Sequence, residues 1–163
     1  MTLQASLKSI THSVWNRRIV GSEEDVKANG TDLFLTAGVT KFGEGNKFDV
    51  DLCAEDEALS GIIVGQADDA TDLDKDSDDT YSDNVNLKMG VPIPSEEMYL
   101  TAVTAATITF GKILQCDGGF FEDTDFSAGA CTVNVPWLSM MFQSIEAVTG
   151  VSGLEIIFLA KRV

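Results

Sequence analysis

The sequence has few basic residues. Eleven Lys and Arg residues stand against 26 Asp and Glu residues, so the 163-residue chain carries a formal net charge of -15. Proteins that bind nucleic acid need clustered Lys and Arg residues to displace the counterions of the phosphate backbone. We therefore expect that nucleic acid is not a partner.

Groups suited to catalysis are also scarce. His12 is the only histidine, so a nucleophile–histidine–carboxylate triad would have to be built from a terminal segment. The acidic residues Glu55, Asp56 and Glu57 suit a polar connection between strands, and no glycine-rich stretch has the spacing of a phosphate-binding loop. The sequence predicts no enzymatic activity, no catalytic residues and no cofactor other than the calcium considered below.

Long apolar runs and paired cysteine motifs are missing as well. The longest apolar-rich stretches, at 100–111 and 154–160, are interrupted by threonine or too short to span a membrane, and the N-terminus does not resemble a secretory signal. We expect a soluble protein with no membrane partner.

Cys53, Cys116 and Cys131 have no CxxC spacing, which argues against a zinc site. Buried thiols are expected, although Cys116 and Cys131 could meet.

Short β-type stretches bounded by Gly, Asn, Asp or Pro recur along the chain. The stretch FDVDL at 48–52 alternates apolar and acidic residues, as in a strand with one solvated face. Glycines at 43–46 and 116–121 suit hairpin turns, because glycine accepts a positive φ. The sequence predicts an all-β fold, a compact β-barrel or sandwich of short strands. Its candidate strands are 32–36, 47–54, 60–66, 85–91, 98–103, 106–110, 111–116, 131–135, 141–148 and 154–160.

The chain is expected to have two parts. Residues 1–20 would form an N-terminal arm or short amphipathic segment, and residues 21–163 a single β-rich domain with an acidic loop at 68–83. Apolar residues of the arm are spaced to share one face of a helix. That face could pack on its own domain or on another subunit, and both alternatives stay open. The interface candidates in the arm are Leu3, Leu7, Ile10, Val14 and Trp15.

A second group of large apolar residues follows Pro136. Core packing and a subunit interface are both consistent with it, since Met and aromatic residues are common in each. The interface candidates in this group are Trp137, Met140, Met141 and Phe142.

Acidic residues are concentrated between Asp68 and Asp83, where eight aspartates accompany a single lysine. Counted from Asp72, the spacing matches the ligand positions of a twelve-residue calcium loop. Ser77 stands where that loop needs glycine, and the last ligand would be aspartate rather than glutamate. A solvated acidic loop therefore competes with a calcium site, whose ligands would be Asp72, Asp74, Asp76, Asp78 and Asp83.

Three segments resemble the small head-decoration, or capsid cement, proteins of tailed bacteriophages and related viruses. They are SGIIVGQ at 60–66, TFGKILQCDGGFFE at 109–122 and MFQSIEAVTGVSGLEIIFLAKRV at 141–163. Their order is similar to that family's early strand, hairpin and final alternating strand after a glycine turn. The resemblance covers residues 58–163, whereas the N-terminal region and the acidic loop depart from the short form of the family.

The resemblance implies a compact β-barrel that decorates and stabilises an assembled capsid shell from the outside. It implies the major capsid protein as partner, a homo-oligomer such as a trimer, and no enzymatic activity. The expected location is the capsid exterior of the virion, after assembly in the host cytoplasm. Two alternatives remain: another virion or surface module, such as a tail, fibre or adhesion component, and a calcium-binding β-domain.

Overall fold

Strands make up the regular structure of this chain wherever it is described. The computed structural model describes residues 21–43, 47–55, 57–66, 79–124 and 140–163. The predicted all-β fold of short strands is confirmed, whereas the expected arm at 1–20 lies outside the described residues. The strands are β1 (Ser22–Ala28), β2 (Gly38–Phe42), β3 (Phe48–Leu52), β4 (Gly61–Gln66), β5 (Asn86–Val91), β6 (Glu97–Thr101), β7 (Ile113–Asp117), β8 (Phe120–Asp123), β9 (Phe142–Ser144) and β10 (Ile157–Arg162).

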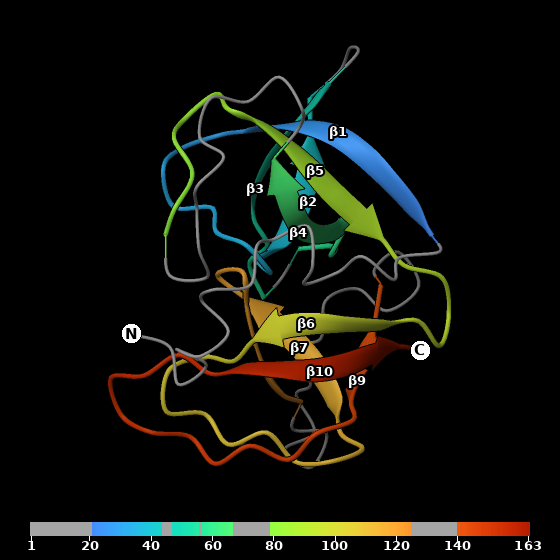
Figure 1. The fold of residues 1–163 in the computed structure, drawn as a ribbon, viewed down its shortest axis with the longest axis vertical. Coiled ribbons are helices and arrows are strands. Elements are labelled where there is room, and N and C mark those ends of the chain that lie inside the picture. The colour runs from blue at the N-terminus through green and yellow to red at the C-terminus, as the bar shows by residue number, and fades with distance from the viewer. Residues whose placement is uncertain (1–20, 44–46, 56, 67–78, 125–139) are drawn as a thin grey trace.

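The first five strands close into a barrel, drawn in the upper half of Figure 1. Their order is β1-β3-β2-β4-β5, and β5 pairs back with β1. The β1–β3 pair is parallel and the other pairs are antiparallel. Alternate residues point inward and fill the barrel, including Val26, Val39, Val50, Leu87 and Met89.

The last five strands form a second sheet in the order β6-β10-β9-β7-β8, below the barrel in Figure 1. Its two edges approach each other, because Ala102, just after β6, forms a bridge with Phe121 of β8. The sheet thereby curls around its own core, in which the rings of Phe121 and Phe142 meet edge to face with centroids 6.0 Å apart.

Strand β4 is a wall shared by the two halves. All six of its residues are buried. Ile63 faces the interior of the barrel, whereas Ile62 and Val64 belong to the apolar cluster of the second sheet. Burial on both faces explains why the sequence of β4 is a continuous apolar run rather than an alternating one.

Backbone contacts join the halves where the chain passes between them. The Gly38 N–H donates to the carbonyl of Gly119, the Gly119 N–H donates to that of Cys53, and the Cys53 N–H donates to that of Gly38. We call these three residues the seam. Beside it, the buried hydroxyls of Thr36 and Thr101 hydrogen-bond at 2.6 Å.

Three strands, β1, β2 and β8, lie outside the candidate strands expected from the sequence. β2 and β8 adjoin the hairpin turns expected at 43–46 and 116–121, whereas nothing in the sequence indicated β1, which the charged stretch SEEDVKA forms. Neighbouring strands neutralise its outward-facing charges, since Asp25 pairs with Lys88 and Lys27 with Asp49. These cross-strand ion pairs let a charged segment complete the barrel.

Other expectations were met in part. Segments 32–36 and 106–110 form isolated bridges rather than strands, at Phe34 and Ile108. The hairpin at 116–121 is confirmed, because Gly118 and Gly119 have φ values of 57° and 83° between the paired residues Asp117 and Phe120. The segment 131–135 lies outside the described residues. In the part of the chain that is described, no helix is long and apolar enough to cross a bilayer.

Candidate functional site

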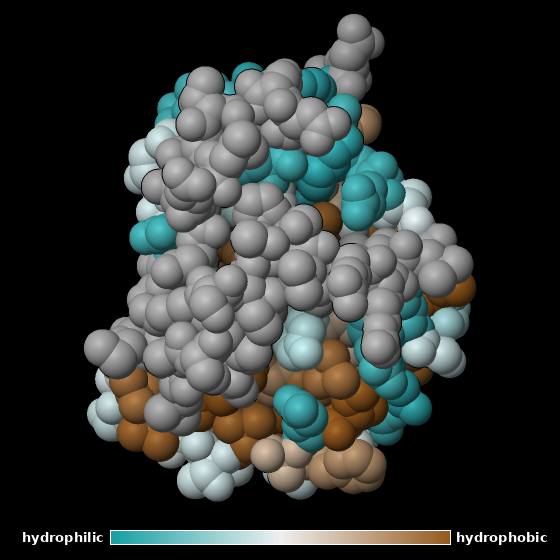
Figure 2. Space-filling view, viewed as in Figure 1, coloured by the Kyte–Doolittle hydropathy of each residue, from teal (hydrophilic) through white to brown (hydrophobic). Residues whose placement is uncertain are grey.

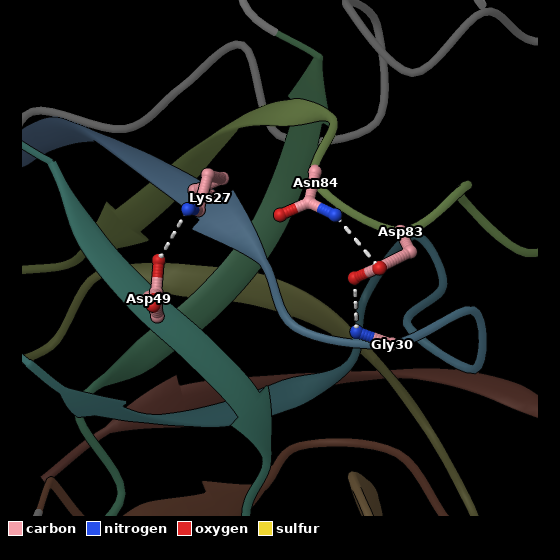
Figure 3. A network of polar contacts seen from close by, with 5 residues as sticks. All are labelled: Lys27, Gly30, Asp49, Asp83 and Asn84. Atoms are coloured by element: carbon pink, nitrogen blue, oxygen red, sulfur yellow. Dashed lines mark hydrogen bonds and ion pairs between the residues drawn. The ribbon is translucent and has the colours of Figure 1, made fainter.

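The predicted calcium ligands fall mostly outside the described residues, and only Asp83 can be placed. Its carboxylate accepts hydrogen bonds from the backbone N–H of Gly30 at 2.8 Å and from Nδ2 of Asn84 at 2.7 Å (Figure 3). Both partners are turn residues, with φ values of 103° at Gly30 and 61° at Asn84. The hydrogen bond between Gly30 and Asp83 therefore connects the segment before β5 to the turn after β1.

No metal centre is formed by the described residues. In the ranges that the structure covers, no three or more His, Cys, Asp or Glu side chains lie close enough to hold an ion. Asp72, Asp74, Asp76 and Asp78 lie outside those ranges, so the calcium loop stays a prediction.

The charged wall of the barrel is built from ion pairs. Asp25 and Lys88 lie 2.5 Å apart, and Lys27 and Asp49, shown in Figure 3, lie 3.2 Å apart. The hydrogen bond from Lys88 and its positive charge lower the pKa of Asp25. The lowered pKa makes the carboxylate of Asp25 poorly suited to general acid–base chemistry near neutral pH.

A third ion pair lies at inward-facing positions near one end of the barrel. Nζ of Lys41 is 2.6 Å from the carboxylate of Glu24 and 4.5 Å from the ring centroid of Phe48. The ammonium group is therefore held between an anion and an aromatic face, which is favourable for a cation. This arrangement covers the end of the apolar barrel core with a neutralised charge.

The cysteines lie at the contact between the two halves. Cys53 and Cys116 are buried and do not form a disulfide, as expected. Sγ of Cys116 lies 3.8 Å from the carbonyl oxygen of Cys53. Burial, reinforced by the neighbouring Cys53 thiol, raises the pKa of Cys116, so Cys116 is not an activated nucleophile. Cys131 lies outside the described residues.

The predicted interface residues are only partly placed. Leu3, Leu7, Ile10, Val14, Trp15 and Trp137 lie outside the described residues. Met140 and Phe142 are buried in the core of the second sheet, whereas Met141 is half-buried. The two buried side chains are engaged in core packing, which was one of the two alternatives. An interface role for this segment stays a prediction.

The structure also brings together two stretches that the sequence analysis did not connect. Residues 101–111 and 147–154 contain no Asp, Glu, Lys or Arg, in a chain of which 23% is charged. Ile108 and Val148 form a bridge in which each N–H donates to the other's carbonyl at 2.9 Å. We call these two stretches the uncharged loop pair. Their lack of charge was the available sequence signal, but we assigned 106–110 to a strand.

The uncharged loop pair presents apolar side chains at its surface. The Phe110 side chain is 68% exposed and the Val151 side chain 41% exposed. The loops lie at the lower end of Figure 1, below the second sheet. In the space-filling view of Figure 2, apolar surface gathers at that end and hydrophilic surface near the barrel. On the face that Figure 2 shows, this end is therefore more apolar than the surface near the barrel.

The structure defines an all-β protein in which a closed barrel and a curled second sheet share one buried wall. No family model and no curated protein matches the sequence. Among solved structures, the chain is similar to the head fiber gp8.5 N base in bacteriophage phi29, with a TM-score of 0.53 and 8% sequence identity. The match covers 87% of this chain and 93% of that chain. It shows a shared fold, and the neighbour is a head fiber protein rather than a head-decoration protein.

Proposed function

We propose that this chain is a structural protein of a phage virion that attaches to the outside of the assembled capsid. The supporting observation is the fold similarity to a phage head fiber base, which spans 87% of this chain and 93% of that one. Such coverage means that the similarity extends into both halves of this chain rather than being confined to one of them. The proposed partner is the major capsid protein, and the proposed location is the capsid exterior after assembly in the host cytoplasm.

The proposed role needs no enzymatic activity, nucleic acid or membrane. A protein present in many copies on one shell can stabilise it through weak contacts, because copy number multiplies their effect. A homo-oligomer, such as a trimer, would engage several capsid subunits at once.

Binding to the shell is the direct test. Capsids of the virus that encodes this chain, assembled without it, would be mixed with the purified chain and separated on a density gradient. We expect the chain to sediment with the capsids and to saturate at a fixed number of copies per shell. A folded chain that remains at the top of the gradient at every concentration would contradict the proposal.

Two finer roles can be separated by imaging the same complexes. A decoration protein would form low caps over the shell and raise its resistance to heat. The fold neighbour favours a second candidate, the base of a projecting fibre, because its solved structure is the base of a head fiber. Cryo-electron microscopy of virions distinguishes the two by whether density projects beyond the domain, and a tail location would exclude both.

The N-terminal arm is the proposed attachment segment. All the strand pairings of the described residues are made between Ser22 and Arg162, so a chain of residues 21–163 should retain its circular dichroism spectrum and cooperative melting. We expect that chain to lose capsid binding. Undiminished binding would exclude the arm as the attachment segment.

Calcium binding by the acidic loop is tested separately. If the loop holds calcium, adding calcium should raise the melting temperature, because a ligand that binds only the folded state stabilises it. Asp74→Ala combined with Asp76→Ala should abolish that rise. An equal rise in the double variant, or no rise in the parent chain, would contradict the proposed site.

A further inference from the structure

We propose that the uncharged loop pair is a surface through which copies of this chain contact one another. This inference rests on the homo-oligomer of the proposed function, for which it names the contact surface, and it does not rest on attachment to a shell. The surface consists of residues 101–111 and 147–154, which the Ile108–Val148 bridge holds side by side.

The net charge of the chain indicates which partner this surface would bind. Two copies that each carry a net charge of -15 repel each other at most orientations. Contact through stretches without charged residues avoids placing like charges directly opposite each other, and the Debye length is only about 8 Å at physiological salt. A basic partner would be drawn to the acidic residues of the chain rather than to the uncharged loop pair. A second copy is therefore the partner that an uncharged surface suits.

Exposed apolar side chains would supply the hydrophobic contribution to this contact. Phe110 is the most exposed large apolar residue of the described chain, at 68%, and Val151 of the neighbouring loop is 41% exposed. An aromatic side chain at the centre of an interface is a common anchor, because its ring buries a large area when a partner covers it. The same stretch, residues 101–111, also carries the exposed neutral polar residues Thr104, Thr107 and Thr109.

The loops are held in place before any partner arrives. The carboxylate of Asp123 accepts a hydrogen bond from the backbone N–H of Thr109 at 3.0 Å, one residue before Phe110. Gly150 packs so closely that a Cβ atom there would overlap the backbone of Ala105 and Ala106. A surface fixed in this way loses little conformational entropy on association, which favours specific contact.

Sedimentation velocity and native mass spectrometry over a range of chain concentrations test the inference. We expect a concentration-dependent oligomer, and Phe110→Glu should weaken it by about 30-fold or more, as for an interface hot spot of about 2 kcal/mol. Phe42→Glu is the matched control, because Phe42 is 42% exposed at the end of β2 in the barrel. It should leave association unchanged. Circular dichroism would check that both variants fold, and Val151→Glu replaces Phe110→Glu if that variant does not.

Salt provides a second readout. Association through the uncharged loop pair should persist or strengthen at 1 M NaCl, a concentration at which the Debye length is about 3 Å, whereas contact through ion pairs should weaken. A monomer at all concentrations would overturn the inference, as would an oligomer that Phe110→Glu leaves intact or that Phe42→Glu weakens equally. Capsid binding is scored in a separate assay, so failure here would remove the homo-oligomer or its surface and leave attachment to the shell to its own test.

Discussion

Replacing Gly38 with alanine should destabilise the protein by filling space at the seam. A Cβ atom at Gly38 would lie 2.5 Å from Sγ of Cys116 and 3.0 Å from both Cδ1 of Leu59 and Cζ of Phe121. Extra methyl groups in a packed core cost about 1–3 kcal/mol. Alanine recovers about 0.4–1 kcal/mol by restricting the unfolded chain, since Gly38 does not have a positive φ. We expect a net loss of about 1–2 kcal/mol.

Chemical denaturation of Gly38→Ala should therefore show a lower midpoint with an unchanged slope. The melting temperature should fall by about 2–8 °C for a chain of this size. Because Cys116 makes the shortest contact, Cys116→Ala should relieve part of the loss in the double variant, giving a coupling energy that two independent sites would not show. Wild-type stability of Gly38→Ala, or strict additivity in the cycle, would refute the argument that the seam is closely packed.

Three further changes test other parts of the structure. Asp83→Ala should cost about 1–2 kcal/mol by chemical denaturation, because the N–H of Gly30 loses a charged acceptor; an unchanged midpoint would contradict a stabilising role for this hydrogen bond. The pKa of Asp25 is lower in the folded chain than its ordinary value of 3.8, so its stabilisation is complete above that value and is lost as the pH falls through the folded pKa. Stability measured from pH 5 to pH 2 should fall more steeply than in Lys88→Met, and parallel profiles would count against the pair. Phe121→Ala should cost about 3–5 kcal/mol, because a fully buried ring is removed; a loss below about 1 kcal/mol would contradict its central place in the second core.

The sequence predicted those strands whose own residue pattern reflects the burial of their faces or the geometry of an adjoining turn. β3 was found because its alternation reports one buried and one solvated face, and the β7–β8 hairpin because two adjacent glycines allow its turn. β1 was missed because its charges are neutralised by Lys88 and Asp49, which lie far away in sequence. The sequence around β1 cannot indicate these ion-pair partners, because only closure of the barrel brings them near.

The candidate surfaces were harder to predict than the fold, for a related reason. A stripe of apolar residues looks the same whether it faces a core or a partner, and the burial of Met140 and Phe142 could be decided only by the packing of β9 against its neighbours. The uncharged loop pair was overlooked for the opposite reason. Neither of its stretches is unusual alone, and the bridge from Ile108 to Val148 makes them one surface.

Ionic and apolar contacts respond differently to salt, so the salt concentration can separate the contacts that hold the shell from those between copies. Contacts made by the acidic residues of this chain with a basic partner weaken as salt rises, whereas contacts between uncharged apolar loops do not. If copies meet through the uncharged loop pair and the shell is held through acidic groups, raising the salt concentration should release intact oligomers from the shell. If the shell is held through apolar residues of the arm instead, both contacts should survive. The species released at high salt therefore identifies which part of this chain holds the capsid.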